Sequence, residues 1–239
     1  MKAFYRNADI EAAVEARLLE MERAMGKPLS LPIPIDYFAE QVLKLDLLWE
    51  EVEELPGELI LGAIMPEKKL IILNERRREH MDACPGLERS TKGHETGHWD
   101  LFVDKATLGH PVLFSQGDDG PFALRSSGVG DVAVIKMLES SPEGRALLRE
   151  IDKRADEPDE ARVVNRYAAA VSMPRALVED EIKKVDRTSW PALYELKGKF
   201  DVTISALVVR LQQLDLLYVK GKQLFEHRDH AIGQARLFG

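Results

Sequence analysis

The sequence predicts an α+β protein that is mostly helical and contains one small antiparallel sheet. Most of the chain has apolar residues at intervals of three and four, which is typical of amphipathic helices. Only residues 45–74 break into short apolar runs between polar segments, which is typical of strands. With 45% hydrophobic residues in 239, the chain can bury a sizeable core.

In the first part of the chain, helices are expected over residues 8–26 and 34–43. The apolar runs LDLLWEEV, LILGAIM and KLIILN follow, and the link PEKK between the last two predicts a hairpin. The next helix is expected over residues 90–104, with Ser90 or Thr91 as its cap.

The second part of the chain is expected to contain turns, several helices and a C-terminal hairpin. Turn-forming residues fill 105–131, and a strongly charged helix is expected over 132–153. After Pro158, the run DEARVVNRYAAAVSM predicts a helix that Pro174 closes, and another helix follows. The chain then reads as two helices about a turn at Asp201, followed by the hairpin LLYVKGKQLF, an order found in DNA-binding proteins.

Composition excludes several classes of protein. The net charge of −8 argues against a general nucleic-acid binder. A single cysteine, Cys84, allows neither an internal disulfide nor a zinc cluster of cysteines. The charged start MKAFYRNADIEAAVEARLLEME does not resemble a signal peptide, and no apolar run is long enough to span a bilayer. We therefore expect a cytoplasmic protein with no membrane partner.

The run HETGH, residues 94–98, contains the candidate metal ligands and the candidate general base. His94 and His98 are four residues apart, so on a helix they share one face and can bind one ion. Zinc suits two imidazoles and leaves room for a third ligand and a water. Glu95 is next to the first ligand, where it can act as general base towards a water that attacks a peptide carbonyl. The pattern predicts a zinc-dependent peptidase.

The surroundings of this motif indicate a buried helix rather than a polar surface helix. Gly93 and Gly97 cost about 1 kcal/mol each in a helix interior, which suggests close approach of another element. Trp99, Leu101 and Phe102 follow immediately and need a core to pack against.

Two stretches resemble the ImmA/IrrE family of zinc metallopeptidases. RSTKGHETGH is similar to that family's R-x-T-x-x-H-E-x-G-H, and NRYAAAVSMP to its N-x-F-A-A-x-L-L-M-P. The segment LKGKFDVTISALVVRLQQLDLL resembles the helix-turn-helix-like ending of the family. The matching positions are Arg89, Thr91, His94, Glu95, Gly97, His98, Asn165, Ala168, Ala169, Met173 and Pro174.

The resemblance implies a gluzincin-like peptidase domain over residues 1–188 and a helix-turn-helix and wing segment over 189–239. It implies Zn²⁺ held by the two histidines and a downstream glutamate, with Glu95 as general base. It also implies a protein substrate, a transcriptional repressor of the helix-turn-helix type. We expect Asn165 and Arg89 to support the ligands from behind, although a surface ion pair or a contact at the helix start is an equal alternative for Arg89.

The chain departs from the family pattern at the third ligand. The usual position, four residues before Asn165, is Ala161, which cannot bind a metal. Glu160 is the predicted substitute, although one residue turns a side chain by about 100° around a helix. Asp159, Glu157 or no carboxylate from this helix remain alternatives.

A second departure is a charged insert over about residues 129–158. We expect a surface excursion there, and a neutral loop insertion explains it more simply than a substrate contact. Two other functions remain open. One is a DNA-binding regulator with a structural or vestigial zinc site, although Arg210 and two glutamines are few groups for reading bases. The other is a non-catalytic, metal-dependent binding protein.

Overall fold

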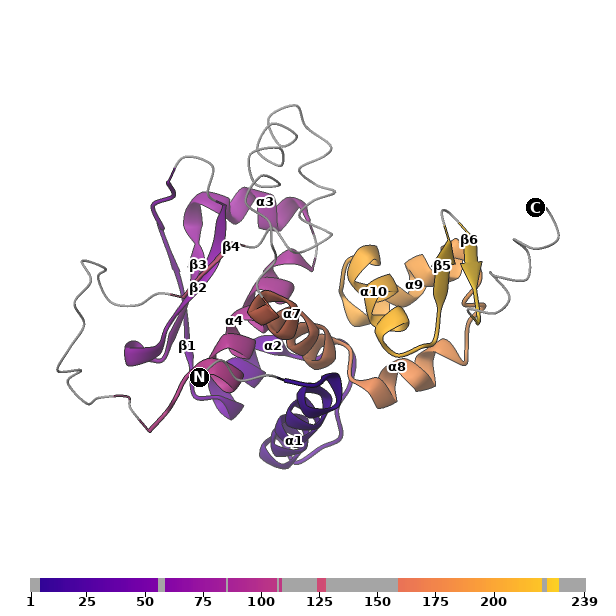
Figure 1. Ribbon diagram of the computed structural model, residues 1–239, viewed down its shortest axis with the longest axis horizontal. Coiled ribbons are helices and arrows are strands. Elements are labelled where there is room, and N and C mark those ends of the chain that lie inside the picture. Colours follow the sequence, from indigo (N-terminus) through magenta and orange to yellow (C-terminus); the bar gives the residue numbers. More distant parts are fainter. Residues whose placement is uncertain are drawn as a thin grey trace.

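The computed structural model describes residues 5–55, 59–84, 86–106, 108, 124–127, 159–220 and 223–227, with 124–127 as backbone alone. The fold is mixed α and β and mostly helical, as predicted. A four-stranded sheet lies at one end of the molecule, α4 and α7 cross its middle, and α8, α9 and α10 form the other end with a small hairpin (Figure 1).

The N-terminal elements follow the predicted pattern closely. Helix α1, Asn7–Met25, ends at Gly26, whose φ of 65° is a left-handed conformation that glycine adopts without strain. Two short helical segments come next, α2 (Ile35–Tyr37) and η1 (Phe38–Val42). Their apolar sides join the sheet, α4 and α7 in the main hydrophobic core.

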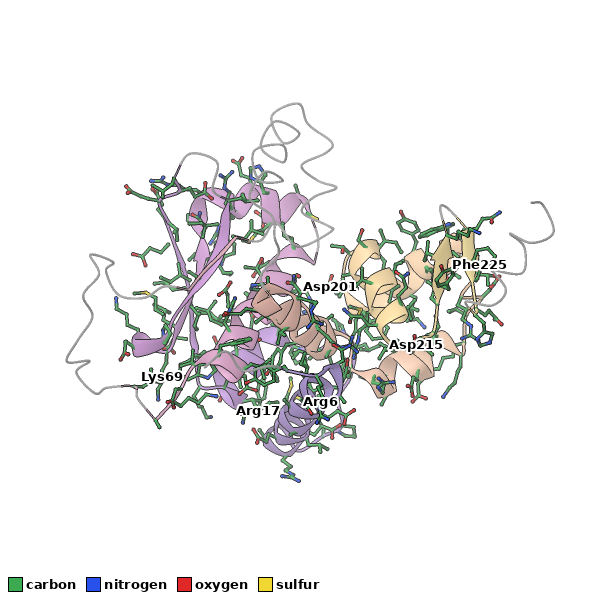
Figure 2. The ribbon with its side chains drawn as sticks, in the orientation of Figure 1. Arg6, Arg17, Lys69, Asp201, Asp215 and Phe225 are labelled. Atoms are coloured by element: carbon green, nitrogen blue, oxygen red, sulfur yellow. The ribbon has the colours of Figure 1, made fainter. Side chains whose placement is uncertain are left out.

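The sheet is mixed, so the prediction of an antiparallel sheet is wrong in one respect. Strand β2, Ile60–Met65, and strand β3, Leu70–Asn74, form the expected antiparallel hairpin. The segment η2 (Pro66–Lys68) and Lys69, which has a φ of 51°, make its turn (Figure 2). Strand β1, Asp46–Glu50, pairs with β3 instead of β2 and runs parallel to it.

The order of strands is β1-β3-β2-β4. Strand β4, Leu124–Ser127, pairs antiparallel with β2, in a region where only turn-forming residues were expected. Apolar runs identify strands but carry no information on which strand lies beside which, and this explains why the parallel pair escaped prediction.

Beyond the sheet come η3 (Glu75–Arg77), α3 (Arg78–Ala83) and α4 (Leu87–Phe102). Helix α4 begins three residues before Ser90, and neither Ser90 nor Thr91 caps it. Its cap is Gly86, with a φ of 91°. A Cβ on Gly86 would lie 3.0 Å from the Cα of Val202, so the start of α4 passes tightly against the C-terminal part of the chain.

Helix α4 packs against α7, Asp159–Ser172, as an antiparallel pair (Figure 1). A Cβ on Gly93 would lie 3.2 Å from the Cβ of Ala168. One on Gly97 would lie 3.2 Å from side-chain atoms of both Val164 and Tyr167. The expectation that both glycines mark a close approach is confirmed.

The C-terminal elements have a hydrophobic core of their own. They are α8 (Arg175–Ile182), α9 (Trp190–Phe200), α10 (Ile204–Gln213) and the antiparallel strands β5 (Tyr218–Lys220) and β6 (Gln223–Phe225). Met173, Val178 and Ile182 belong to this core, so it begins near Pro174, and the domain boundary at residue 188 stays a prediction.

A buried ion pair ties α10 to α1. The guanidinium of Arg210 is fully buried and bonds both carboxylate oxygens of Glu11, at 2.7 and 2.8 Å, and the carbonyl of Met173 at 3.0 Å. Burial by itself would raise the pKa of Glu11. The hydrogen bonds and charge of Arg210, with help from Arg166, outweigh burial and hold that pKa below its usual value.

None of the helices in the described ranges combines the length and the apolar character needed to cross a membrane. The predicted helix over 132–153 and the insert over about 129–158 lie outside the described residues.

Candidate metal centre

Helices α4 and α7 supply the polar side chains of the candidate site. The histidine pair from α4 is brought together as the spacing predicts, with their Nε2 atoms 3.1 Å apart. Two nitrogens that bind one tetrahedral zinc ion at about 2.0–2.1 Å lie about 3.3 Å from each other. The observed separation of the Nε2 atoms of His94 and His98 therefore suits a shared ion with little rearrangement.

Each imidazole ring is held from behind by a side chain of α7. Nδ1 of His94 lies 2.8 Å from Oδ1 of Asn165, and Nδ1 of His98 lies 3.1 Å from Oε1 of Glu160. The carboxylate of Glu160 can only accept, so Nδ1 of His98 donates to it, and the same direction at Oδ1 of Asn165 would leave each Nε2 with a lone pair. This is the arrangement that orients histidine ligands in metal proteins.

The charge state of His98 also suits a cation. Burial lowers the pKa of His98 to about 4, so its ring is neutral at physiological pH. Neutral imidazole is the form that binds metals. The two Nε2 atoms lie 3.1 Å apart, and a cation between them would be bound by both when each ring carries its proton on Nδ1.

Glu160 lies on the outer side of the His98 ring, where it contacts Nδ1 rather than joining the two Nε2 atoms. Within the described ranges, no three His, Cys, Asp or Glu side chains form a group that could hold a metal. The rotation of about 100° between neighbouring helix positions explains this placement, because Glu160 precedes the expected position of Ala161 by one residue. The role of Glu160 as third ligand stays a prediction, and the side chains of Asp159 and Glu157 lie outside the described part.

Glu95 is fully buried on the side of α4 that faces the sheet. A Cβ on Gly62 of β2 would lie 2.7 Å from Cγ2 of Thr91 and 3.6 Å from Cγ of Glu95. Strand β2 therefore passes directly over these two residues, and only glycine fits there. A carboxylate kept out of water is costly, and such groups cluster at functional sites.

Arg89 does not contact the histidines. Its Nη2 donates to the carbonyl of Ile33 at 2.6 Å, and its Nε lies 3.5 Å from Oδ2 of Asp201. Five residues separate Arg89 from His94, which turns the two side chains about 140° apart around α4. The structure thus places Arg89 at the junction of α4 with the C-terminal helices, which agrees with the alternative of a contact near the helix start.

A cluster of hydrogen bonds at Asp100 joins α4 to α7 and to α1. Tyr167 of α7 donates to Oδ2 of Asp100 at 2.9 Å, and Arg17 of α1 donates to the same carboxylate, with its shortest contact at 2.7 Å. Burial acts to raise the pKa of Asp100, but the hydrogen bonds and charge of Arg17 outweigh it and lower that pKa. This cluster helps to hold α4 and α7 at their observed distance, on which the contacts from α7 to the Nδ1 atoms of the two histidines depend.

No family model matches this chain, and no curated protein matches it significantly. The candidate function therefore rests on the motif, its geometry and the resemblance of the two sequence stretches.

Proposed function

We propose that the protein is a metal-dependent endopeptidase similar to the ImmA/IrrE metallopeptidases. The observation that carries the proposal is the pair of Nε2 atoms, 3.1 Å apart, with each Nδ1 hydrogen-bonded to a side chain of α7. Surface histidines have no need for two oriented partners on a neighbouring helix, whereas ligand histidines do. Zinc is the proposed ion because two neutral imidazoles suit it.

The residues of the site divide the work. His94 and His98 hold the ion, and Asn165 fixes the orientation of the His94 ring. A divalent ion held there would acidify a water and polarise the scissile carbonyl. Glu95, on the neighbouring position of the helix, accepts the proton of the water and delivers it to the leaving amine. The third ligand is proposed to be Glu160 or Asp159.

The proposed substrate is a protein, a repressor of the helix-turn-helix type, and this part rests on the sequence resemblance. Tight binding of DNA is not proposed. Arg210 is the arginine that α10 would offer to a base edge, and its guanidinium is fully buried against Glu11. The net charge of −8 also opposes affinity for a polyanion.

The position of Glu160 favours a second candidate function, a metal-binding protein without turnover. With its carboxylate engaged by Nδ1 of His98, the ion would have two protein ligands instead of the three usual in catalytic zinc sites. A substitution of Glu95 distinguishes the two functions, because Glu95 is needed for cleavage and not for binding the ion.

Three proteins separate these functions: the wild type, Glu95→Gln and His94→Ala. Zinc content is measured by elemental analysis. Cleavage is measured by mass spectrometry, with unfolded casein and a purified helix-turn-helix repressor as the two substrates. We expect Glu95→Gln to keep zinc and to lose at least about a hundred-fold in rate, since it removes a positioned base. His94→Ala should lose both zinc and activity.

Cleavage by Glu95→Gln at the wild-type rate would contradict the role of the base. Full zinc in His94→Ala would contradict the metal site itself. A wild type that binds zinc and cleaves neither substrate would favour the non-catalytic alternative.

A further inference from the structure

We infer that the cavity between α4, α7 and α10 binds an uncharged aliphatic side chain of the substrate, close to the scissile bond. The inference deepens the proposed function and rests on it for the word substrate. None of the residues of the HETGH run lines this cavity.

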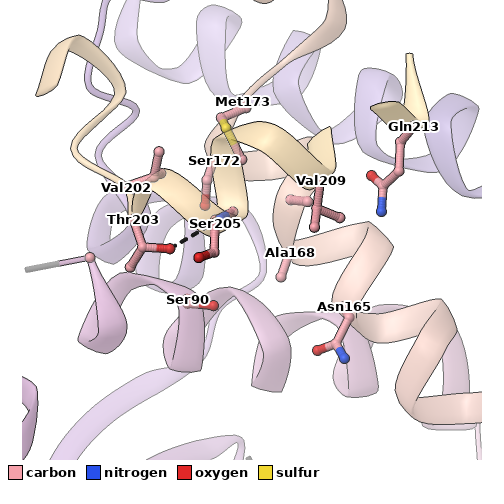
Figure 3. A pocket seen from close by; sticks show the side chains of 13 residues that line it. Ser90, Asn165, Ala168, Ser172, Met173, Val202, Thr203, Ser205, Val209 and Gln213 are labelled. Carbon is pink, nitrogen blue, oxygen red and sulfur yellow. Dashed lines mark hydrogen bonds between the residues drawn. The ribbon is translucent and has the colours of Figure 1, made fainter. Parts of the chain in front are cut away.

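The cavity adjoins the histidine pair. It measures about 90 Å³, and Asn165, whose Oδ1 lies 2.8 Å from Nδ1 of His94, is one of its walls (Figure 3). Ser90 of α4 lines it from below and precedes His94 by one helical turn, which is about 6 Å along the axis. An extended peptide advances about 3.3 Å per residue, so the cavity lies within one or two residues of a bond held at His94.

The walls of the cavity select against charge and large size. Every described residue that lines it is uncharged, although 31% of the whole chain is charged. Ala168 of α7 and Val209 of α10 lie on facing walls (Figure 3), and Ala169 and Ala206 also line the space. An engineered cavity of about 150 Å³ binds benzene, so this smaller cavity suits a branch of three or four carbons better than an aromatic ring.

One end of the cavity is formed by the uncharged amide side chain of Gln213. Gln213 stands beyond Val209, and within the described chain its buried Oε1 has no hydrogen-bond partner (Figure 3). Buried amide oxygens are nearly always bonded. A ligand N–H could bond this oxygen only after the Gln213 side chain turned towards the cavity, so the choice of occupant rests on the volume and the uncharged walls. Valine, leucine, isoleucine and methionine are therefore the expected occupants.

The first test uses metal-free protein and needs no catalysis. N-acetyl-leucinamide is titrated into protein with labelled methyl groups and followed by NMR. We expect saturable shifts of the Val209 methyl signals with a dissociation constant on the order of millimolar. N-acetyl-lysinamide should produce none, because no described wall residue can pair its charge.

Filling the cavity provides the matched control. Ala206→Leu places a side chain in the space and should weaken binding of N-acetyl-leucinamide by at least ten-fold. Ala16→Leu makes the same exchange at an exposed position of α1 and should change nothing. Ala169→Val is a smaller second filling variant in case Ala206→Leu does not fold. Undiminished binding in a folded filling variant, or equal binding of the lysine compound, would overturn the inference.

A second experiment separates the inference from the proposed function. Zinc-loaded wild type and Ala206→Leu are given a peptide library, and the cleaved positions are sequenced. We expect an aliphatic preference at one position beside the cleaved bond, shifting to glycine or alanine in the variant. Cleavage with no such preference would overturn the pocket and leave the peptidase standing. Binding of the leucine compound without any cleavage would leave the pocket and refute the peptidase.

Discussion

Gly97 sets how closely α4 and α7 approach, and Gly97→Ala tests this packing. The added Cβ would lie 3.2 Å from Cδ1 of Tyr167, 3.2 Å from Cβ of Val164 and 3.3 Å from Cβ of Tyr167. Carbon atoms prefer separations of about 3.5–4.0 Å, so the helices must move apart by a few tenths of an ångström. Gly198→Ala is the control, because nothing lies within 4 Å of a Cβ built on Gly198 in α9.

The two substitutions should have opposite effects on stability. Each gains about 1 kcal/mol of helix propensity, and overpacking at Gly97 costs about 1–3 kcal/mol. Gly97→Ala should therefore lose about 1 kcal/mol, whereas Gly198→Ala should gain up to about 1 kcal/mol. With an m-value of about 2 kcal/mol/M in urea, their unfolding midpoints should differ by about 1 M.

The separation of α4 and α7 in Gly97→Ala should also change the metal site. His94 and His98 belong to α4 while Asn165 and Glu160 belong to α7, so separating the helices lengthens the hydrogen bonds of 2.8 and 3.1 Å. We expect zinc affinity to fall about ten-fold in Gly97→Ala and to stay unchanged in Gly198→Ala. Equal stabilisation by the two substitutions, with unchanged zinc affinity, would refute the reasoning.

Three other predictions concern the hydrogen-bonded partners. If Glu160 orients His98 through Nδ1, the zinc affinity measured by titration should stay within a few-fold of wild type in Glu160→Gln, because glutamine keeps an acceptor oxygen. In Glu160→Ala, the zinc affinity should fall about ten-fold or more. A Gln variant that binds zinc as weakly as the Ala variant would mark Glu160 as a direct ligand. Asn165→Ala should weaken zinc binding about 10–100-fold, and equal affinity would exclude its role at His94. Glu11→Gln should cost about 3 kcal/mol in urea unfolding at pH 7, because it leaves Arg210 charged and buried. Since the folded pKa of Glu11 is lowered, wild-type stability should be full above its unfolded pKa of about 4.3 and fall as the pH drops through the folded pKa. The Gln variant should lack this part of the pH dependence, and parallel curves for the two proteins would contradict the ion pair's contribution.

The local elements of the fold were predictable, and their arrangement was not. Apolar spacing identified α1, the β2–β3 hairpin and the C-terminal helices, because each pattern is contained in one segment. The parallel pairing of β1 with β3 depends on contacts across the sheet and left no local signal. The start of α4 was missed because Gly86 caps it by its left-handed conformation, where a serine or threonine side chain was expected.

The site shows the same division. The i, i+4 spacing of His94 and His98 fixes the distance between their Nε2 atoms within one helix, so sequence sufficed. The contact of Glu160 with Nδ1 depends on how α7 is rotated against α4, and one residue of offset turns its carboxylate from the two Nε2 atoms towards the other side of the His98 ring. The cavity at Ser90 and Gln213 arises between three helices, and no spacing in the sequence indicates it.

The central claim is that one ion is shared by Nε2 of His94 and Nε2 of His98, and X-ray absorption of the zinc-loaded protein tests it most directly. The account predicts about one zinc per chain, with nitrogen or oxygen neighbours at about 2.0–2.1 Å and the outer-shell scattering of two imidazole rings. In His98→Ala, the signal of one ring should disappear together with most of the bound zinc. A wild-type spectrum without imidazole scattering, or an unchanged spectrum in His98→Ala, would contradict the account.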